Sequence, residues 1–272
     1  MYDSKQKFLP FKIKSSFIYG VTWLIALLMV IVSLAGILYR NQIYSNETLL
    51  NTFLPNDVVN LIFGLPALLG CILLSRRDSL IGLLCWPGAL LFVLYNYIAY
   101  VFALPLNMLF LLHLSLVMLS LYALFYLLAN MDTALIANHL QDTFPQKLTA
   151  GVLMTLGSLF FVRVIAVIIQ PLNGSASLST AELAVNVADF LITPAWIISG
   201  VQLWRRQAWG FGSAPAMLFQ ASLLFLALLA FLLLQPLFTG APFAAADVFV
   251  IGIMGLVCWV PFGLLLRSML TR

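Results

Sequence analysis

Charged residues are scarce in this chain. Only 8% of the 272 residues are Asp, Glu, Lys or Arg, whereas about 25% of a soluble globular protein is charged. Hydrophobic residues make up 63%, and the mean hydropathy is +1.08. A water-soluble fold of this size has no way to bury so much apolar surface, so the solvent must be lipid. The composition therefore excludes a soluble enzyme, a disordered chain, a coiled coil and a disulfide scaffold.

Cysteine and histidine are also rare. Cys71, Cys85 and Cys258 stand singly within apolar runs and form no C-x-x-C pair, so neither a disulfide framework nor a zinc site is expected. His113 is the only histidine within an expected span, which excludes a single-chain transmembrane bis-His haem. No H-E-x-x-H, G-x-S-x-G, Walker or dinucleotide-binding pattern occurs. The sequence thus predicts no metal site and identifies no cofactor.

Long runs without charge define the expected membrane spans. Residues 15–39, 58–75, 79–131 and 207–246 carry no charged side chain. At 1.5 Å per residue, the run 79–131 would form roughly 80 Å of helix, more than twice the ~30 Å hydrocarbon core. That run must therefore turn back on itself, and the segment around Pro105 is the expected place. The runs do not alternate as the strands of a transmembrane barrel do.

The sequence therefore predicts an all-α, polytopic membrane protein with eight transmembrane helices. The expected spans are 16–39, 54–75, 79–101, 106–129, 148–170, 182–204, 213–235 and 243–266. A cleavable signal peptide is the alternative for the first span, because Ser33-Leu34-Ala35 weakly resembles a cleavage site. The apolar stretch is longer than the usual hydrophobic region of a signal peptide, about 7–15 residues, which argues against cleavage.

Lysine and arginine are distributed unevenly between the two sides of the membrane. If the spans alternate, eleven of these residues fall on one side and only Arg40 on the other. Cytoplasmic loops carry such an excess, so both termini are expected in the cytoplasm and the protein in the plasma membrane. The eleven are Lys5, Lys7, Lys12, Lys14, Arg76, Arg77, Lys147, Arg205, Arg206, Arg267 and Arg272.

The net charge of +4 reflects this topology and does not indicate a nucleic-acid partner. The lipid bilayer is the expected partner. Four arginines in two adjacent pairs could also bind anionic lipid headgroups, although membrane anchoring explains them equally well. These arginines are Arg76, Arg77, Arg205 and Arg206.

A shift of 128 residues brings two stretches of the chain into register. The matched positions are Pro66 with Pro194, Ala67 with Ala195, Arg77 with Arg205, Gly82 with Gly210, Pro87 with Pro215 and Leu90 with Leu218. A four-helix unit crosses the membrane an even number of times, so its copy has the same orientation and the repeat is parallel. Chance matching in a biased composition is the alternative explanation.

The expected organisation follows from this repeat. It comprises a cytoplasmic N-terminal segment 1–15, a first four-helix repeat 16–129, a cytoplasmic linker 130–147 and a second four-helix repeat 148–272. Asp132 is expected to cap a short amphipathic helix within the linker.

Polar side chains within the spans gather toward their exoplasmic ends. Arg163, Asp189 and His113 each lie seven residues from the outer end of a span, which is roughly 10 Å deep. Ionisable groups inside a membrane are costly and are functional candidates. Arg163 and Asp189 lie on consecutive antiparallel spans and are expected within reach of each other, beside a cavity open to the exoplasmic side. The expected ligand-binding residues are Arg163, Asp189, His113, Asn96, Tyr97 and Asn60.

Arg163 and Asp189 could instead form a structural ion pair that only neutralises two charges. The repeat favours a site, because Ala35 and Leu61 occupy the corresponding positions of the first half and a pair needed to hold each half together would occur twice. Three further carboxylates are expected at the outer rim, as helix N-terminal charges that the helix dipole stabilises. They are Asp57, Glu182 and Asp247.

Three functions fit these patterns. The first is binding, sensing or transport of a small or lipid-like ligand at the exoplasmic-facing polar site. The second is a non-catalytic structural or assembly subunit of a larger membrane complex, whose partner subunits supply the activity. The third is an intramembrane enzyme acting on lipid, with His113 or Asp189 as acid/base and Arg163 as an oxyanion or phosphate clamp.

Overall fold

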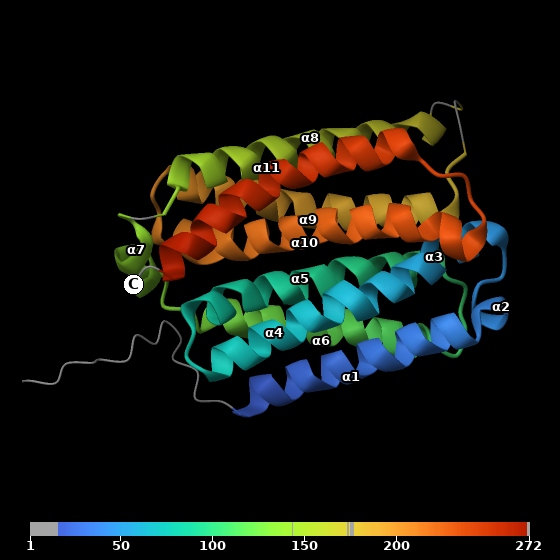
Figure 1. Cartoon of the computed structure of the whole chain (residues 1–272), viewed down its shortest axis with the longest axis horizontal. Helices are drawn as coiled ribbons and strands as arrows, with labels where there is room; N and C mark the ends of the chain where they lie inside the picture. The colour runs from blue at the N-terminus through green and yellow to red at the C-terminus, as the bar shows by residue number, and fades with distance from the viewer. Residues whose placement is uncertain (1–15, 143, 173, 175–176, 271–272) are drawn as a thin grey trace, which may run out of the picture.

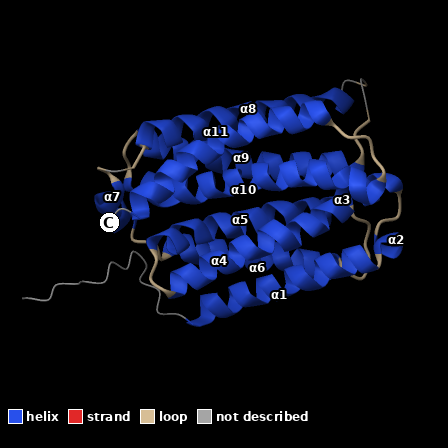
Figure 2. Cartoon of the chain, viewed as in Figure 1, coloured by secondary structure: helices blue, strands red, loops and turns tan. Residues whose placement is uncertain are grey.

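The computed structural model describes residues 16–142, 144–172, 174 and 177–270. Throughout this part of the chain the regular structure is helical, without strands (Figure 2). Eight helical segments in it are long and apolar enough to cross a membrane. The predicted all-α, multi-pass architecture is therefore confirmed. The expected N-terminal segment 1–15 lies outside the described residues.

Most expected spans match a helix to within a few residues. In chain order the elements are α1 Ser16–Leu38, α2 Arg40–Ile43, α3 Glu47–Val59, the π-helix η1 Asn60–Gly64, α4 Leu65–Arg76, α5 Leu80–Ala103, α6 Phe110–Ala129, α7 Thr133–Leu140, α8 Gln146–Leu172, α9 Thr180–Trp204, α10 Ala208–Thr239 and α11 Ala245–Leu270.

The second span begins earlier than expected, at Glu47 rather than residue 54, and runs on to Arg76 through α3, η1 and α4. Asn46 caps it, since its side chain accepts a hydrogen bond from the Leu49 amide at 2.8 Å. Pro55 lies inside the helix and cannot donate to the carbonyl of Asn51. That carbonyl accepts instead from the Gln235 side chain of α10, at 3.2 Å, so a tertiary contact replaces the bond that proline removes.

The spans lie side by side along the long axis of the molecule (Figure 1). Helix α5 is buried along nearly its whole length and contacts α4, α6, α9 and α10. Helix α10 makes the corresponding contacts with α3, α5, α9 and α11. We call the end of the bundle that carries α2 the α2 end, and the opposite end the α7 end. The start of α1 and the end of α11 both lie at the α7 end, as an even number of spans requires.

The two Arg-Arg turns at the α7 end have the same backbone geometry. Asp78 and Arg206 both adopt φ 56°, in the left-handed region. Each turn has the two hydrogen bonds of a Schellman motif, which ends a helix by closing back on its last turn. The bonds are Asp78 N–H to Ser75 O at 3.0 Å and Ser79 N–H to Leu74 O at 3.1 Å, matched by Arg206 N–H to Leu203 O at 2.9 Å and Gln207 N–H to Gln202 O at 2.9 Å.

The 128-residue shift relates every donor and acceptor in these two turns. It also relates Gly88 of α5 to Ala216 of α10, and these two residues are in contact: a Cβ on Gly88 would overlap the Ala216 carbonyl. Contact between counterpart residues is expected where two parallel repeats meet on a pseudo-two-fold axis. These features support the duplication, which stays a prediction.

The linker helix α7 packs against α10 at the α7 end. As expected, Asp132 caps it, accepting a hydrogen bond from the Leu135 amide at 3.0 Å. Ile136 and Leu140 are buried, whereas Leu135 is exposed. The helix therefore presents an apolar face to the bundle.

Candidate functional site

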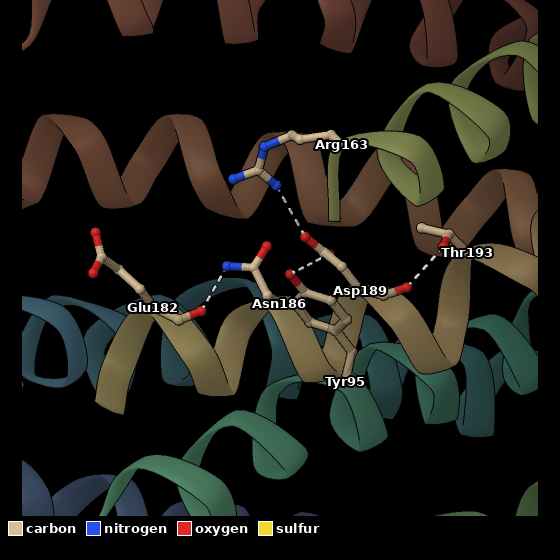
Figure 3. A network of polar contacts seen from close by, with 6 residues as sticks. All are labelled: Tyr95, Arg163, Glu182, Asn186, Asp189 and Thr193. Atoms are coloured by element: carbon tan, nitrogen blue, oxygen red, sulfur yellow. Dashed lines mark hydrogen bonds and ion pairs between the residues drawn. The ribbon is translucent and has the colours of Figure 1, made fainter. Parts of the chain in front are cut away.

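Helix α9 carries a stripe of polar side chains. Glu182, Asn186, Asp189 and Thr193 are spaced three or four residues apart and so share one face. Ser179 and Glu182 form a capping box that begins the helix. Glu182, Asn186 and Asp189 leave α9 on the side from which Arg163 of α8 approaches (Figure 3). The stripe therefore faces α8 and extends from the α2 end into the membrane-spanning part.

Arg163 and Asp189 form an ion pair. The Arg163 guanidinium lies 3.3 Å from Oδ2 of Asp189 (Figure 3). The other carboxylate oxygen, Oδ1, accepts a hydrogen bond from the Tyr95 hydroxyl of α5 at 2.9 Å. The expectation that the two charges lie within reach of each other is thus confirmed. The contact also joins three helices, α5, α8 and α9, around one carboxylate.

The two members of the pair differ in exposure. The Asp189 side chain is 13% exposed, and both its oxygens have partners, whereas the Arg163 side chain is 50% exposed. A guanidinium has five N–H donors in a planar fork, and the Asp189 contact uses one nitrogen. No second partner of Arg163 is found among the described residues. A cation needed only to neutralise Asp189 would gain more from a bidentate contact.

Arg163 lines a cavity of about 1120 Å³. This volume is slightly above the usual range for ligand sites, about 300–1,000 Å³. The polar lining lies toward the α2 end and at the level of the ion pair. It includes Thr48, Asn51, Thr52, Asn56, Tyr95, Asn96, Ser179, Glu182, Asn186 and Gln235.

The deeper wall of the cavity is apolar and largely aromatic. It includes Phe92, Leu159, Phe160, Trp196, Leu224 and Phe225. Phe160 packs against both Trp196 and Phe225, with ring centroids 6.3 and 6.0 Å apart. The Trp196 ring nitrogen donates to Gln220 at 2.6 Å, so the polar atom of this large side chain is satisfied away from the cavity. A cavity that is polar toward one end and aromatic toward the other suits an amphiphile.

One polar atom on the wall lacks a partner. The Asn186 side chain donates to the Glu182 carbonyl at 2.8 Å, but its Oδ1 is buried without a hydrogen bond among the described residues. A buried acceptor without a partner is costly. Since Asn186 lines the same cavity as Arg163, a ligand with both a donor and an anionic group would satisfy both side chains.

Of the expected site residues, Asn96 lines this cavity with Arg163 and Asp189, but three others do not. Tyr97 and His113 are buried in a separate aromatic cluster, where the His113 ring lies 5.8 Å from that of Tyr97 and 5.0 Å from that of Tyr100. Asn60 is fully buried in η1, and both polar atoms of its side chain lack partners among the described residues. Expecting these three beside the ion pair was therefore wrong, while their role in ligand binding stays a prediction. Depth along a helix does not set the direction of a side chain.

Asp57 lies in this second cluster, so its expected place at the rim was also wrong. It is ten residues past the start of α3, about 15 Å along the helix, and it is completely buried. The Tyr44 hydroxyl donates to Oδ2 of Asp57, and the Tyr100 hydroxyl donates to Oδ1 at 2.7 Å. Burial, followed by the nearby Asp57 charge, raises the pKa of the Tyr44 phenol, which keeps it protonated as a donor.

The residues that sequence reasoning missed are Tyr95, Asn56 and Asn186. The spacing of Asn186 from Glu182 and Asp189 places all three on one helical face and could have identified it. No local signal in the sequence distinguishes Tyr95 from Tyr97 and Tyr100 in the same span.

The arginine pairs at the α7 end remain candidates for anionic lipid. Arg76 lies over the Tyr19 and Trp23 rings of α1, 5.3 and 5.8 Å from their centroids. Such stacking on aromatic faces holds the guanidinium near the surface. Lipid binding there stays a prediction. Among the described residues, no group of three His, Cys, Asp or Glu could hold a metal ion.

Comparisons with known proteins give no relative: no family model, no curated protein and no solved structure matches the chain.

Proposed function

We propose that this integral membrane protein binds an amphiphilic, lipid-like ligand in the cavity beside Arg163, with the α2 end facing the exoplasmic side. The main support for the proposal is the half-exposed guanidinium of Arg163. It lies on the wall of a large cavity, and its contact with Asp189 leaves other N–H donors available to a ligand. An anionic group of the ligand would meet Arg163, and its apolar part would lie against Phe160, Trp196 and Phe225.

The aromatic wall favours an amphiphile over a hydrophilic solute, because it would leave the inner part of a polar solute without hydrogen-bond partners, which is costly. Glu182 in the polar lining adds a carboxylate that could accept a cationic headgroup, so a zwitterionic ligand also fits. The arrangement supports binding, whereas sensing and transport need a second conformation.

The lipid-acting enzyme is the weaker candidate. His113 does not line the cavity, so it is not placed to act as an acid or base beside Arg163. Asp189 lines the cavity, but Arg163 and Tyr95 already occupy its two oxygens. An assembly role with partner subunits stays open, and co-purification of a constant partner would support it.

The test uses the full chain in lipid nanodiscs and two probes with the same fluorescent label. Lysophosphatidylglycerol is anionic, and a monoacylglycerol of equal chain length is neutral. We expect Arg163→Gln to weaken binding of the anionic probe by about 10- to 100-fold, since a hydrogen bond to a charged group contributes about 1.5–3 kcal/mol. Arg40→Gln, which removes an exposed arginine at the α2 end that does not line the cavity, is the matched control and should bind normally.

The exchange of both charges, Arg163→Asp with Asp189→Arg, separates a site from a brace. It should keep folding if the pair is only a brace, and it should abolish anionic binding if the cavity requires a cation at position 163. Full anionic binding by the exchanged protein, or equal binding of both probes by the unaltered protein, would contradict the proposal.

A further inference from the structure

Asp57 is a buried carboxylate without a cationic partner. It is completely buried between α1, α3 and α5, and a Cβ on Gly36 of α1 would overlap its carboxylate. Its hydrogen-bond partners are the hydroxyls of Tyr44 and Tyr100. No lysine, arginine or second carboxylate among the described residues bonds to it.

The titratable groups around Asp57 come from the loop after α2 and from α5 and α6. Tyr44 and Tyr100 bond to Asp57, and the rings of Tyr97 and His113 pack against the Tyr100 ring. His113 Nε2 is buried without a partner among the described residues. The cluster thus contains one carboxylate, one imidazole and three phenols, shielded from lipid and water.

An ionised carboxylate in such surroundings is expensive. Two hydroxyl donors offset part of the lost hydration, but no positive charge offsets the rest. Binding a proton removes the charge at once. The ring of donors argues against a metal cation, which would need acceptor oxygens turned toward it.

Tyr100 has two acceptors within reach, and this permits a protonated arrangement without losing a hydrogen bond. Its hydroxyl lies 2.7 Å from Asp57 Oδ1 and 3.3 Å from the carbonyl of Phe53. When a proton adds to Oδ1, the new O–H donates to the Tyr100 oxygen, and the Tyr100 hydrogen turns to the Phe53 carbonyl. One proton is gained, the hydrogen bond between Asp57 and Tyr100 reverses its direction, and the Tyr100 hydroxyl donates to the Phe53 carbonyl instead.

This change in hydrogen bonding would affect residues that line the cavity. The Asn56 amide donates to the same Tyr100 oxygen at 3.3 Å, and it would share that acceptor with a protonated Asp57. Asn56 and Phe53 both line the cavity beside Arg163. A contiguous path of contacts therefore runs from Asp57 through Tyr100 to the cavity wall.

We propose that Asp57 is a proton-binding site within the membrane-spanning part, and that Tyr100 and Asn56 couple its proton to occupancy of the cavity. The coupling rests on the proposed binding function, whereas the proton site does not.

The proton site is tested without any ligand, by infrared difference spectroscopy of the purified full chain between acidic and alkaline buffer. We expect a carboxyl C=O band from a protonated carboxyl whose pH dependence differs from that of exposed carboxyls. Asp57→Asn should remove this band, and Asp247→Asn, which changes an exposed aspartate, should leave it in place. No such band, or an unchanged band in Asp57→Asn, would overturn the proton site.

Tyr44→Phe and Tyr100→Phe keep the carboxyl and serve if Asp57→Asn does not fold. Each removes one hydroxyl partner of Asp57, so each should shift the frequency of the same band. A band that neither substitution moves does not come from Asp57, and that result would also overturn the proposal.

The coupling is tested with the labelled lysophosphatidylglycerol, whose phosphodiester keeps its charge over the whole pH range. We expect its affinity to change at least about threefold across the pH range in which the Asp57 band titrates, a modest coupling. Asn56→Leu should flatten this dependence while the band persists. Ser115→Ala is the control, because Ser115 lies outside the cavity and its hydroxyl donates within its own helix.

The outcomes distinguish the two proposals. If no probe binds at any pH, the binding function fails and the coupling with it, while the infrared band still decides the proton site. If the probe binds with a pH-independent affinity, or if Asn56→Leu keeps the full dependence, the coupling is wrong.

Discussion

At the scale of single residues, close approach decides where a polar group can be buried. Helix α1 passes Asp57 at Gly36, where any side chain would occupy the place of the carboxylate and of the Tyr44 hydroxyl. The close contact with Asp57 is the reason for glycine at position 36. Its backbone conformation is not the reason, because it is that of an ordinary helical residue. The buried carboxylate therefore depends on a missing Cβ in another helix.

Gly36→Ala is expected to destabilise the protein by about 1–3 kcal/mol, because the added methyl group must displace Asp57 or push α1 outward. Unfolding of the purified full chain, followed by tyrosine fluorescence or circular dichroism, measures the loss. Gly20→Ala on the same helix is the control, since a Cβ there meets nothing within 4 Å. Equal stability of the two variants would show that the contact is not tight.

At the scale of elements, the Arg-Arg turns are unusual because they use a residue with a side chain where glycine is favoured. Asp78 and Arg206 both have φ 56°, a conformation that is unfavourable for residues other than glycine. Backbone geometry therefore does not explain the arginine at 206. The expected explanation is positive charge on the cytoplasmic side of the membrane.

Arg206→Gly is expected to raise stability by about 0.5–1 kcal/mol, because relief of the left-handed conformation exceeds the added freedom of the unfolded chain. Arg205→Gly is the matched control: it removes the same charge from the same turn, but Arg205 has φ −79°, so it should lower stability. Thermal unfolding of both variants measures the difference. If Arg205→Gly were more stable than Arg206→Gly, the strain argument would be wrong.

At the scale of the whole molecule, the cavity lies where the two halves of the chain meet. Helices α3 and α5 supply one wall, and α8, α9, α10 and α11 supply the other. Arg163 and Asp189 both come from the second half, and Tyr95 from the first. Ligand binding and any relative movement of the halves would therefore act on the same contacts.

The predicted topology places both ends of the chain in the cytoplasm. Reporter fusions after Gln141 and after Gly174 should give signals from opposite sides, because α8 separates the two positions. The expected result is a cytoplasmic signal at Gln141 and an exoplasmic signal at Gly174. A cytoplasmic signal at Gly174 would reverse the orientation and with it the side to which the cavity opens.

The sequence by itself determined that the solvent is lipid, how many spans there are and how deep most polar residues lie. The length of the charge-free runs indicates the lipid solvent and the number of spans, since a helix needs about 20 apolar residues to cross a bilayer. The fixed rise per residue gives the depth of a residue along its helix, and it correctly placed Arg163 level with Asp189. The start of the second span was the exception, because Asp57 was read as a helix N-terminal charge although Asn46 begins that helix.

Only the tertiary structure decided which polar residues share a site. Asn96 and Tyr97 are neighbours in the chain, but each residue turns a helix by about 100°, so Asn96 lines the cavity while Tyr97 packs against His113. The rotation of each helix depends on how all its neighbours pack, and no segment of the sequence specifies it alone. That is why the sequence predicted the Arg163–Asp189 pair, whereas the division of the remaining polar residues between the cavity and the Asp57 cluster came from packing.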